Sequence, residues 1–219
     1  MPDINGIPYE NAEDLQYYFY DNFLSSESLT YDATFTGSVT AKLAELKLTT
    51  GVVQDSLVVL YYDPVIFNPL YSRVVFKLRL DDPKDCFAFI GYKETTAEPT
   101  FDMTESHAGW LFKNGRVYVS VADGYHQQRV EVIGIDPVRF MNYQIEYNKF
   151  SAQPLPIVEE SLSLLTILSV DRTWKLMDTL TNCPPINEAH YLVMSIKNSV
   201  NAEKNLYVNR IIYREVYAD

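Results

Sequence analysis

The feature that most constrains the fold is a hairpin signal in residues 108–122. Asn114-Gly115 separates two segments in which apolar residues alternate with others. Asn-Gly is the preferred pair of a two-residue type I′ turn, because both positions need a positive φ. A turn there pairs Lys113 with Arg116 and predicts one buried face. That face carries Ala108, Trp110, Phe112, Val117, Val119 and Val121.

The opposite face of this predicted hairpin is mixed in character. It carries His107, Gly109, Leu111, Lys113, Arg116, Tyr118 and Ser120. Because neighbouring residues of a strand point to opposite sides, these side chains share one surface. We expect that surface to be solvated or to line a groove.

The rest of the chain also favours strands. Val74, Phe76, Leu78 and Leu80 alternate with Arg73, Val75, Lys77 and Arg79, the pattern of a half-buried strand. Further strands are predicted at 46–48, 52–62, 86–92, 129–135, 143–147, 162–170, 191–196 and 206–217. Residues 11–23 suit a short helical turn that leads into a first strand. About ten to twelve short strands at this spacing predict an all-β, antiparallel two-sheet β-sandwich.

Length and composition agree with this class. The chain has 219 residues, among them 17 Tyr and 11 Phe, residue types that favour half-buried pleated surfaces. A chain of this length buries enough surface to fold without disulfides or metals. No linker or repeat divides it. We therefore expect an N-terminal arm at residues 1–10 and a single β-sandwich domain at residues 11–219.

Charge and cysteine content exclude several classes of protein. The net charge is -11 and the 18 Lys and Arg residues are scattered along the sequence, so we expect no nucleic-acid partner. No apolar run is long enough for a membrane span, and the N-terminus lacks the pattern of a signal peptide. Cys86 and Cys183 are predicted to be free thiols. These features favour folding in a reducing cytoplasm.

A succession of motifs resembles a known family. It runs through Phe89-Ile90-Gly91-Tyr92, residues 107–118, Asp123-Gly124 and residues 143–147 (Tyr-Gln-Ile-Glu-Tyr). In this order the motifs resemble the concanavalin A-like lectin/glucanase (laminin G-like) jelly rolls, a family that includes phage and virus structural proteins. The resemblance covers residues 70–150 and implies a jelly-roll fold. It does not imply one activity, because this fold carries many functions.

The sequence offers no recognisable catalytic or metal site. Glucanases of this family use a Glu-x-Asp-x-x-Glu strand, and no strand here carries that motif, which leaves Glu131 and Glu146 without a partner carboxylate. Glu105-x-His107 with Asp102 gives too few ligands for zinc. Glu94, Glu98, Asp102 and Glu105 could bind calcium, although a solvated acidic loop explains them better. We predict no enzyme activity, no metal and no cofactor.

Two surfaces are candidates for ligand binding. The first is a groove lined by Arg116, Tyr118, Gln144 and Glu146, where an aromatic face could stack on a sugar while polar groups orient it. Gln144 and Glu146 are expected to point outward from their strand. The second is the hairpin rim at Tyr125 and His126.

These observations favour a non-enzymatic structural or binding protein of a phage or virus particle, in capsid decoration or host attachment. Its partners would be other virion proteins or identical subunits, with a cell-surface glycan as a further candidate, and its location the virion. The C-terminal segment looks apolar on both faces, which favours burial against a neighbouring subunit. The alternatives are a carbohydrate-binding lectin-like module outside a virus and a glycoside hydrolase.

Overall fold

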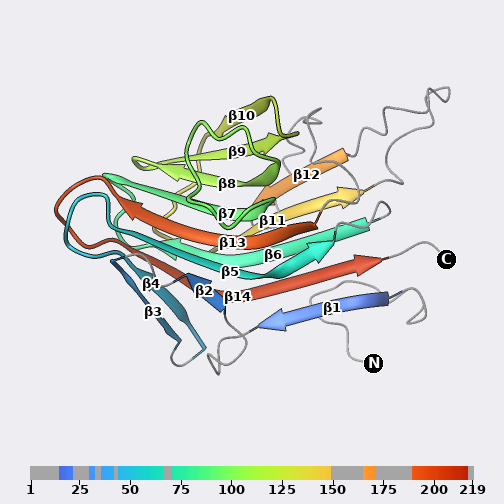
Figure 1. Cartoon of the computed structure of the whole chain (residues 1–219), viewed down its shortest axis with the longest axis horizontal. Helices are drawn as coiled ribbons and strands as arrows, with labels where there is room; N and C mark the ends of the chain where they lie inside the picture. The colour runs from blue at the N-terminus through green and yellow to red at the C-terminus, as the bar shows by residue number, and fades with distance from the viewer. Residues whose placement is uncertain are drawn as a thin grey trace.

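A computed structural model of the chain, shown in Figure 1, describes residues 15–21, 30–32, 36–41, 44–66, 71–148, 165–170 and 189–216. In this part of the chain every regular element is a β-strand. The strands form two stacked sheets, and all of their pairings are antiparallel. The predicted all-β two-sheet sandwich is confirmed.

Sheet A has the order β12-β11-β6-β14-β4-β3, and β1 pairs with the C-terminal half of β14. Its strands are β1 (Leu15–Asp21), β3 (Ser38–Ala41), β4 (Leu46–Thr49), β6 (Tyr71–Leu80), β11 (Met141–Asn148), β12 (Leu165–Val170) and β14 (Asn205–Val216). Sheet B has the order β10-β9-β8-β7-β13-β5-β2. Its strands are β2 (Thr30–Asp32), β5 (Leu57–Ile66), β7 (Cys86–Lys93), β8 (His107–Lys113), β9 (Arg116–Ala122), β10 (Gln127–Val132) and β13 (Ala189–Asn198).

The predicted hairpin is formed by β8 and β9. Lys113 pairs with Arg116, Phe112 with Val117 and Trp110 with Val119. Asn114 and Gly115 both have positive φ, 51° and 82°. All six residues predicted for the inner face are buried. The turn chemistry therefore sets the register, and the register sets which side chains enter the core.

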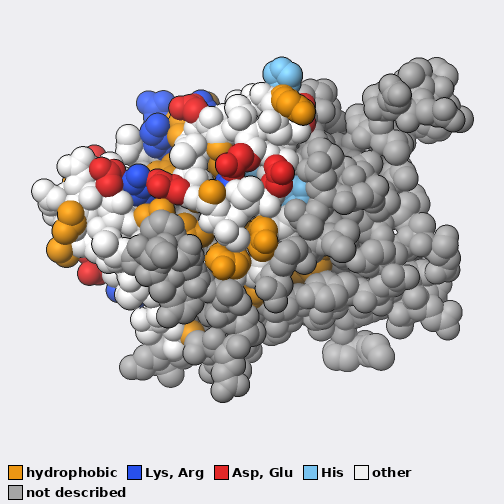
Figure 2. All heavy atoms as spheres, viewed as in Figure 1, with side chains coloured by type: hydrophobic (Ala, Val, Ile, Leu, Met, Phe, Trp, Pro, Cys, Tyr) orange, Lys and Arg blue, Asp and Glu red, His pale blue; other side chains and the backbone are white. Residues whose placement is uncertain are grey.

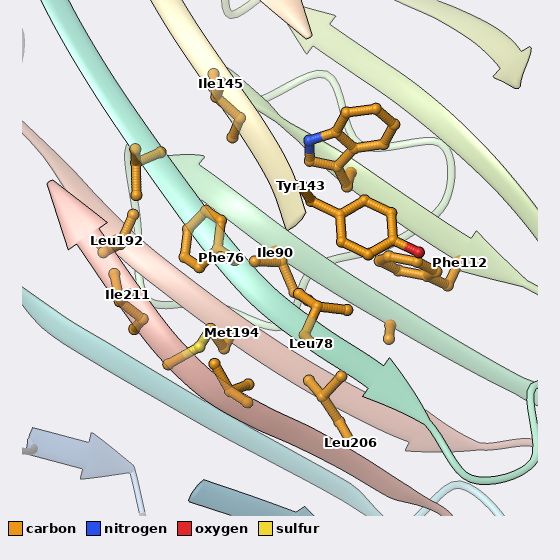
Figure 3. Close-up of a cluster of buried hydrophobic side chains, with 14 of the residues drawn as sticks. Phe76, Leu78, Ile90, Phe112, Tyr143, Ile145, Leu192, Met194, Leu206 and Ile211 are labelled. Atoms are coloured by element: carbon orange, nitrogen blue, oxygen red, sulfur yellow. The ribbon is translucent and has the colours of Figure 1, made fainter. Parts of the chain in front are cut away.

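The main core lies between the two sheets, as Figure 3 shows for side chains from β6, β7, β8, β11, β13 and β14. Tyr143 of sheet A contacts two rings of sheet B edge-on, with ring centroids 5.2 Å from Trp110 and 5.3 Å from Phe112. The buried indole also donates a hydrogen bond from Nε1 to the backbone oxygen of Gln144, at 3.2 Å. These contacts fasten the hairpin to sheet A.

A bulge explains why β14 looks apolar on both faces. The pairing with β6 shifts between Val208 and Arg210, so that Asn209 is an extra residue. The shift reverses the alternation, and four apolar residues of β14 therefore reach the same core: Leu206, Val208, Ile211 and Tyr213. These four residues need no neighbouring subunit to cover them, whereas Tyr207 and Ile212 lie on the outer face of sheet A. Tyr217, also part of the predicted pattern, lies outside the described residues.

Other strand boundaries differ from the predictions. β5 continues through Asp63-Pro64, because these two residues lie opposite a single residue of β13 in a bulge that tolerates proline. Its predicted start is wrong, since Val52 and Val53 are exposed and belong to a turn. β10 ends at Val132 instead of 135.

At the N-terminus, residues 15–21 form a strand that pairs with β14, in agreement with the predicted first strand. Residues 11–14, where the predicted helical turn would precede it, lie outside the described residues. The predicted arm at residues 1–10 and Cys183 lie outside the described residues. The other cysteine, Cys86, is buried and free, as predicted.

Candidate functional site

The connection between β7 and β8, residues 94–106, crosses the outer face of sheet B and is called the strap below. In Figure 1 it is the green segment in front of these strands. Its residues alternate along residues 98–104: Pro99 and Met103 are buried against the sheet, whereas Thr100, Asp102 and Thr104 are exposed. Met103 belongs to a second apolar cluster, outside the main core, with Leu57, Val59, Phe89, Leu111 and Val193. The strap thus covers the middle of this face.

A buried lysine holds the C-terminal end of the strap. The Lys93 side chain is fully buried, and its ammonium group donates to the carboxylate of Glu105 and to the Thr95 hydroxyl. Burial raises the pKa of Glu105, but the hydrogen bond and charge of Lys93 outweigh this, and the net pKa of Glu105 is lowered. Glu105 is therefore an anion whose role is to neutralise Lys93.

A buried histidine holds the same end from the other side. Nδ1 of His107 lies 2.7 Å from the backbone oxygen of Glu105, and Nε2 lies 2.8 Å from Oγ of Ser120. The amide of Gln127 also donates to Oγ of Ser120, at 2.9 Å. Burial lowers the pKa of His107 to about 4. The imidazole is therefore neutral at physiological pH.

A serine–histidine pair lies beside this cluster. Oγ of Ser106 is 2.9 Å from Nε2 of His190, a distance that suits a nucleophile and its base. Both side chains are buried, Ser106 at 1% and His190 at 0% exposure. No substrate can reach this hydroxyl while the strap is in place. The pair therefore acts as a structural contact between the strap and β13.

Beside the strap, a more accessible group of aromatic and charged side chains lies over β8, β9 and β10. The ring of Phe101 contacts Tyr118 edge-on, with centroids 5.1 Å apart. Two cations lie over the Phe101 ring, Lys113 at 4.0 Å and Arg129 at 3.5 Å from its centroid. We call this the Phe101–Tyr118 surface, made of Phe101, Lys113, Arg116, Tyr118, Arg129 and Glu131.

Ion pairs complete the Phe101–Tyr118 surface. Arg116 donates to Glu131 at 3.3 Å, and its pKa is raised by a hydrogen bond with Tyr118 and by the charge of Glu131. Arg129 donates to the backbone oxygen of Phe101 at 2.6 Å and to Asp102 at 3.0 Å. Figure 2 shows this face, with acidic and basic side chains close together over the strands of sheet B. The surface offers paired charges next to half-exposed rings.

The structure does not assemble the predicted groove of Arg116, Tyr118, Gln144 and Glu146. Arg116 and Tyr118 lie together on the outer face of sheet B. Gln144 and Glu146 lie on β11 in sheet A, the other layer of the sandwich. The sequence pattern gives the face that each residue takes on its own strand, but it cannot assign that strand to a sheet.

Gln144 points away from the core, as predicted, but it is buried. It is 5% exposed, and its side chain accepts a hydrogen bond from Arg73, at 2.6 Å. The backbone of Glu146 pairs with Arg73, and its side chain lies outside the described part. A binding role for these two residues stays a prediction, separate from any role of Arg116 and Tyr118.

Tyr125 and His126 lie at the tip between β9 and β10, as predicted for a hairpin rim. Tyr125 is 82% exposed. Asp123 accepts hydrogen bonds from the backbone nitrogens of Tyr125 and His126, and the latter bond lowers the pKa of Asp123 most. These hydrogen bonds hold the backbone of the tip, and its binding role stays a prediction.

Sequence reasoning missed Phe101, Arg129 and Glu131 as neighbours of Tyr118. Arg129 and Glu131 alternate with Val130 and Val132, and this period of two was the available signal. The position of Phe101 had no such signal, because it follows from the path of the strap.

Most described charged groups on this face form ion pairs with one another. Lys197, at the far end of β13, pairs with Glu98 at 2.7 Å and Asp55 at 3.7 Å. Glu98, Asp102 and Glu105, considered above as calcium or zinc ligands, each bind a lysine or arginine instead. Within the described residues no three His, Cys, Asp or Glu side chains converge to hold a metal ion. Nor does this part contain a helix long and apolar enough to cross a membrane.

Several known structures share this architecture. The carbohydrate recognition domain of Emp46p in its potassium-bound form matches with a TM-score of 0.61 and 8% identity, over 90% of this chain and 93% of that chain. The endo-1,3-beta-glucanase from Streptomyces sioyaensis matches with a TM-score of 0.62 and 9% identity, over 91% and 96%. The beta-glucanase from Bacillus licheniformis matches with a TM-score of 0.58 and 12% identity, over 90% and 98%.

These likenesses define the class of fold. The chain has the concanavalin A-like jelly-roll fold of lectins and glucanases, as the resemblance in residues 70–150 implied. No protein-family model matches the sequence, and no curated protein is detectably similar to it in sequence. At these identities the similarity concerns the fold, and the function has to be argued from the chain's own residues.

Proposed function

We propose that this chain is a non-enzymatic carbohydrate-binding module that uses the Phe101–Tyr118 surface. The observation that carries the proposal is the half-exposed Tyr118 ring beside the Arg116–Glu131 ion pair. An aromatic ring can stack on the apolar face of a sugar, while a guanidinium and a carboxylate exchange hydrogen bonds with its hydroxyl groups. All three side chains project from rigid strands, so little entropy is lost on binding.

The fold supports a glycan as the ligand. Structures that share it are named as carbohydrate recognition domains and as beta-glucanases. Both groups of proteins are named for carbohydrates. What they share with this chain is the β-sandwich fold.

The state of the carboxylates supports binding over hydrolysis. A retaining glycosidase needs two carboxyl groups roughly 5 Å apart, one of which must be protonated to act as an acid. On the described outer face of sheet B, Glu131 pairs with Arg116, Asp102 with Arg129 and Glu105 with Lys93. For Glu105 the effect of burial is outweighed by the hydrogen bond and charge of Lys93, which lower the pKa and make this carboxylate a poor general acid.

A glycan-binding screen tests the proposal. The chain is applied to immobilised neutral glucans and to a panel of oligosaccharides, with Tyr118→Ala as the test variant and Tyr191→Ala as the control. Tyr191 is another half-buried tyrosine on this face, paired with Tyr61 on β13 and β5. We expect Tyr118→Ala to lose binding by about tenfold or more and Tyr191→Ala to retain it. No binding to any neutral glycan, or equal loss in both variants, would contradict the proposed site.

A place in a phage or virus particle is a narrower proposal that rests on the sequence argument alone. It predicts that the chain occurs in repeated copies in a purified particle. Mass spectrometry of such particles tests it, and recovery of the chain only from particle-free fractions would reject it. The glycan-binding proposal does not depend on the result.

A further inference from the structure

The outer face of sheet A gathers cations that the sequence scatters. Lys77 and Arg79 project from β6, and Arg210 projects from β14, all on the side opposite the core. Among the described residues none of these three has a carboxylate partner. Most described cations of the sheet B face differ in this respect: Lys93, Arg116, Arg129 and Lys197 form ion pairs, whereas Lys113 lies over the Phe101 ring.

The register brings two of these cations directly opposite each other. Lys77 pairs with Arg210 across β6 and β14, immediately after the bulge. Like charges in directly opposed positions destabilise a sheet. Arg210 reaches across β6 and donates to Asn142 of β11 at 3.3 Å. Its Nε is buried and finds no acceptor in the described part of the chain. Both features cost stability unless an anion binds between the two side chains.

Aromatic rings border this pair. Tyr207 pairs with Arg79 on one side and with Lys47 on the other. The guanidinium of Arg79 lies 4.1 Å from the Tyr207 centroid and 5.0 Å from that of Phe140. These ring contacts use the face of the guanidinium and leave its edge N–H groups available to a ligand.

We propose that Lys77, Arg79 and Arg210 form a second binding site, and that it takes an acidic polysaccharide whose carboxylates lie along the sheet face. The choice of a sugar polymer rests on the proposed function, whereas the anionic character rests on three cations that form no ion pair within the described part of the chain. The distance between paired strands and the distance between alternate residues of one strand place neighbouring cations roughly 5 to 7 Å apart. Successive carboxylates of an extended polysaccharide can therefore each contact one cation.

The net charge argues for a sugar acid over a nucleic acid. At -11 the molecule as a whole repels polyanions, and a DNA duplex carries one charge per roughly 1.7 Å. A polysaccharide with more widely spaced carboxylates meets less of this repulsion while it uses the same local cations.

Binding of polygalacturonate, measured by affinity electrophoresis and calorimetry at low and high salt, tests the site. We expect wild-type binding that weakens with salt. Lys77→Gln should weaken it by about tenfold, as expected for the loss of one charged contact. Lys84→Gln, which removes the same charge at an exposed position of the β6–β7 turn, should leave it within about twofold.

Further measurements separate this site from the one on sheet B. Tyr118→Ala should lose neutral glycan but retain polygalacturonate, and Lys77→Gln should show the reverse. Without ligand, Lys77→Gln should be at least as stable as wild type, because it relieves the repulsion with Arg210. Three results would each overturn the inference. The wild-type protein could fail to bind polygalacturonate, or Lys77→Gln and Lys84→Gln could weaken its binding equally. A DNA duplex of equal charge could also bind more tightly than polygalacturonate.

Discussion

Ser120 donates its hydroxyl hydrogen to Nε2 of His107, over 2.8 Å. The direction follows from the neighbours. Nδ1 faces the backbone oxygen of Glu105, which can only accept, so the imidazole hydrogen is on Nδ1. Nε2 of the neutral ring is then an acceptor. The strap is therefore held by an imidazole that must stay neutral, buried near the ammonium of Lys93, which also lowers its pKa.

This arrangement predicts acid sensitivity. The pKa of His107 is about 4 in the fold and 6.5 ordinarily. Between these values the unfolded chain binds more protons, so the free energy of unfolding falls as pH drops from about 6.5 to 4, by roughly 3 kcal/mol in total. Urea denaturation at a series of pH values measures it. The variant His107→Gln should lose this part of the slope, and an unchanged slope would contradict the account.

The carboxylates define a control for that experiment. The hydrogen bond from Lys204 lowers the pKa of Asp82, so its contribution to stability is present above the ordinary carboxyl pKa and is lost only as pH falls below it. Asp82→Asn should therefore leave the slope above pH 5 intact. If Asp82→Asn also lost the pH dependence of stability above pH 5, His107 would not be the source of that dependence.

The strap depends on Met103. This side chain is buried against Phe89 and Leu111, and truncating a buried methionine costs about 2 to 5 kcal/mol. We expect Met103→Ala to destabilise the domain and to speed proteolytic cleavage within residues 94–106. Thr104→Ala, at the adjacent exposed position, is the control and should behave like wild type. Equal cleavage rates in the two variants would show that the strap is held by other contacts.

The β8–β9 turn depends on Gly115. Its φ is 82°, and a Cβ placed there meets nothing within 4 Å, so the cost of a side chain is conformational and not steric. Gly115→Val should lower the free energy of unfolding by about 1 kcal/mol or more, because a β-branched residue disfavours this region. Asn114→Gly should be close to neutral. A fully stable Gly115→Val variant, measured by thermal denaturation, would refute the turn geometry.

The thiol of Cys86 should not react with thiol reagents in the folded protein. Burial raises the pKa of its thiol to about 12, and the thiolate is the reactive form. In a Cys183→Ser background we expect no reaction with a thiol reagent at pH 8 until denaturant is added. Rapid labelling of the native protein would mean that this thiol is accessible.

The hairpin shows how far local chemistry predicts this fold. Asn114-Gly115 fixes one turn type, and the alternation on either side then places Trp110 and Val119 in the core. Asn209 shows what the sequence alone could not predict. Its residue type does not indicate the bulge that reverses the alternation in β14. Reading β14 without that bulge places Tyr213 on the wrong face and overstates the case for a subunit interface.

The candidate site was predictable only in part, for a related reason. Arg116 and Tyr118 follow from the alternation around one turn, but Gln144 lies on the other sheet, and strand order is set by long-range pairing. Phe101 reaches Tyr118 through the strap, a contact between segments that share no periodic pattern. The scattered cations Lys77 and Arg210 meet for the same reason, across β6 and β14.

Chemical-shift mapping with a neutral oligosaccharide, chosen from the binding screen, tests the central claim most directly. The same titration follows the sugar's own signals over time. We predict that shifts concentrate on Phe101, Arg116, Tyr118 and Glu131, and that the oligosaccharide stays intact. Shifts confined to sheet A or to the tip at Tyr125, or the appearance of hydrolysis products, would contradict a non-enzymatic glycan site on sheet B.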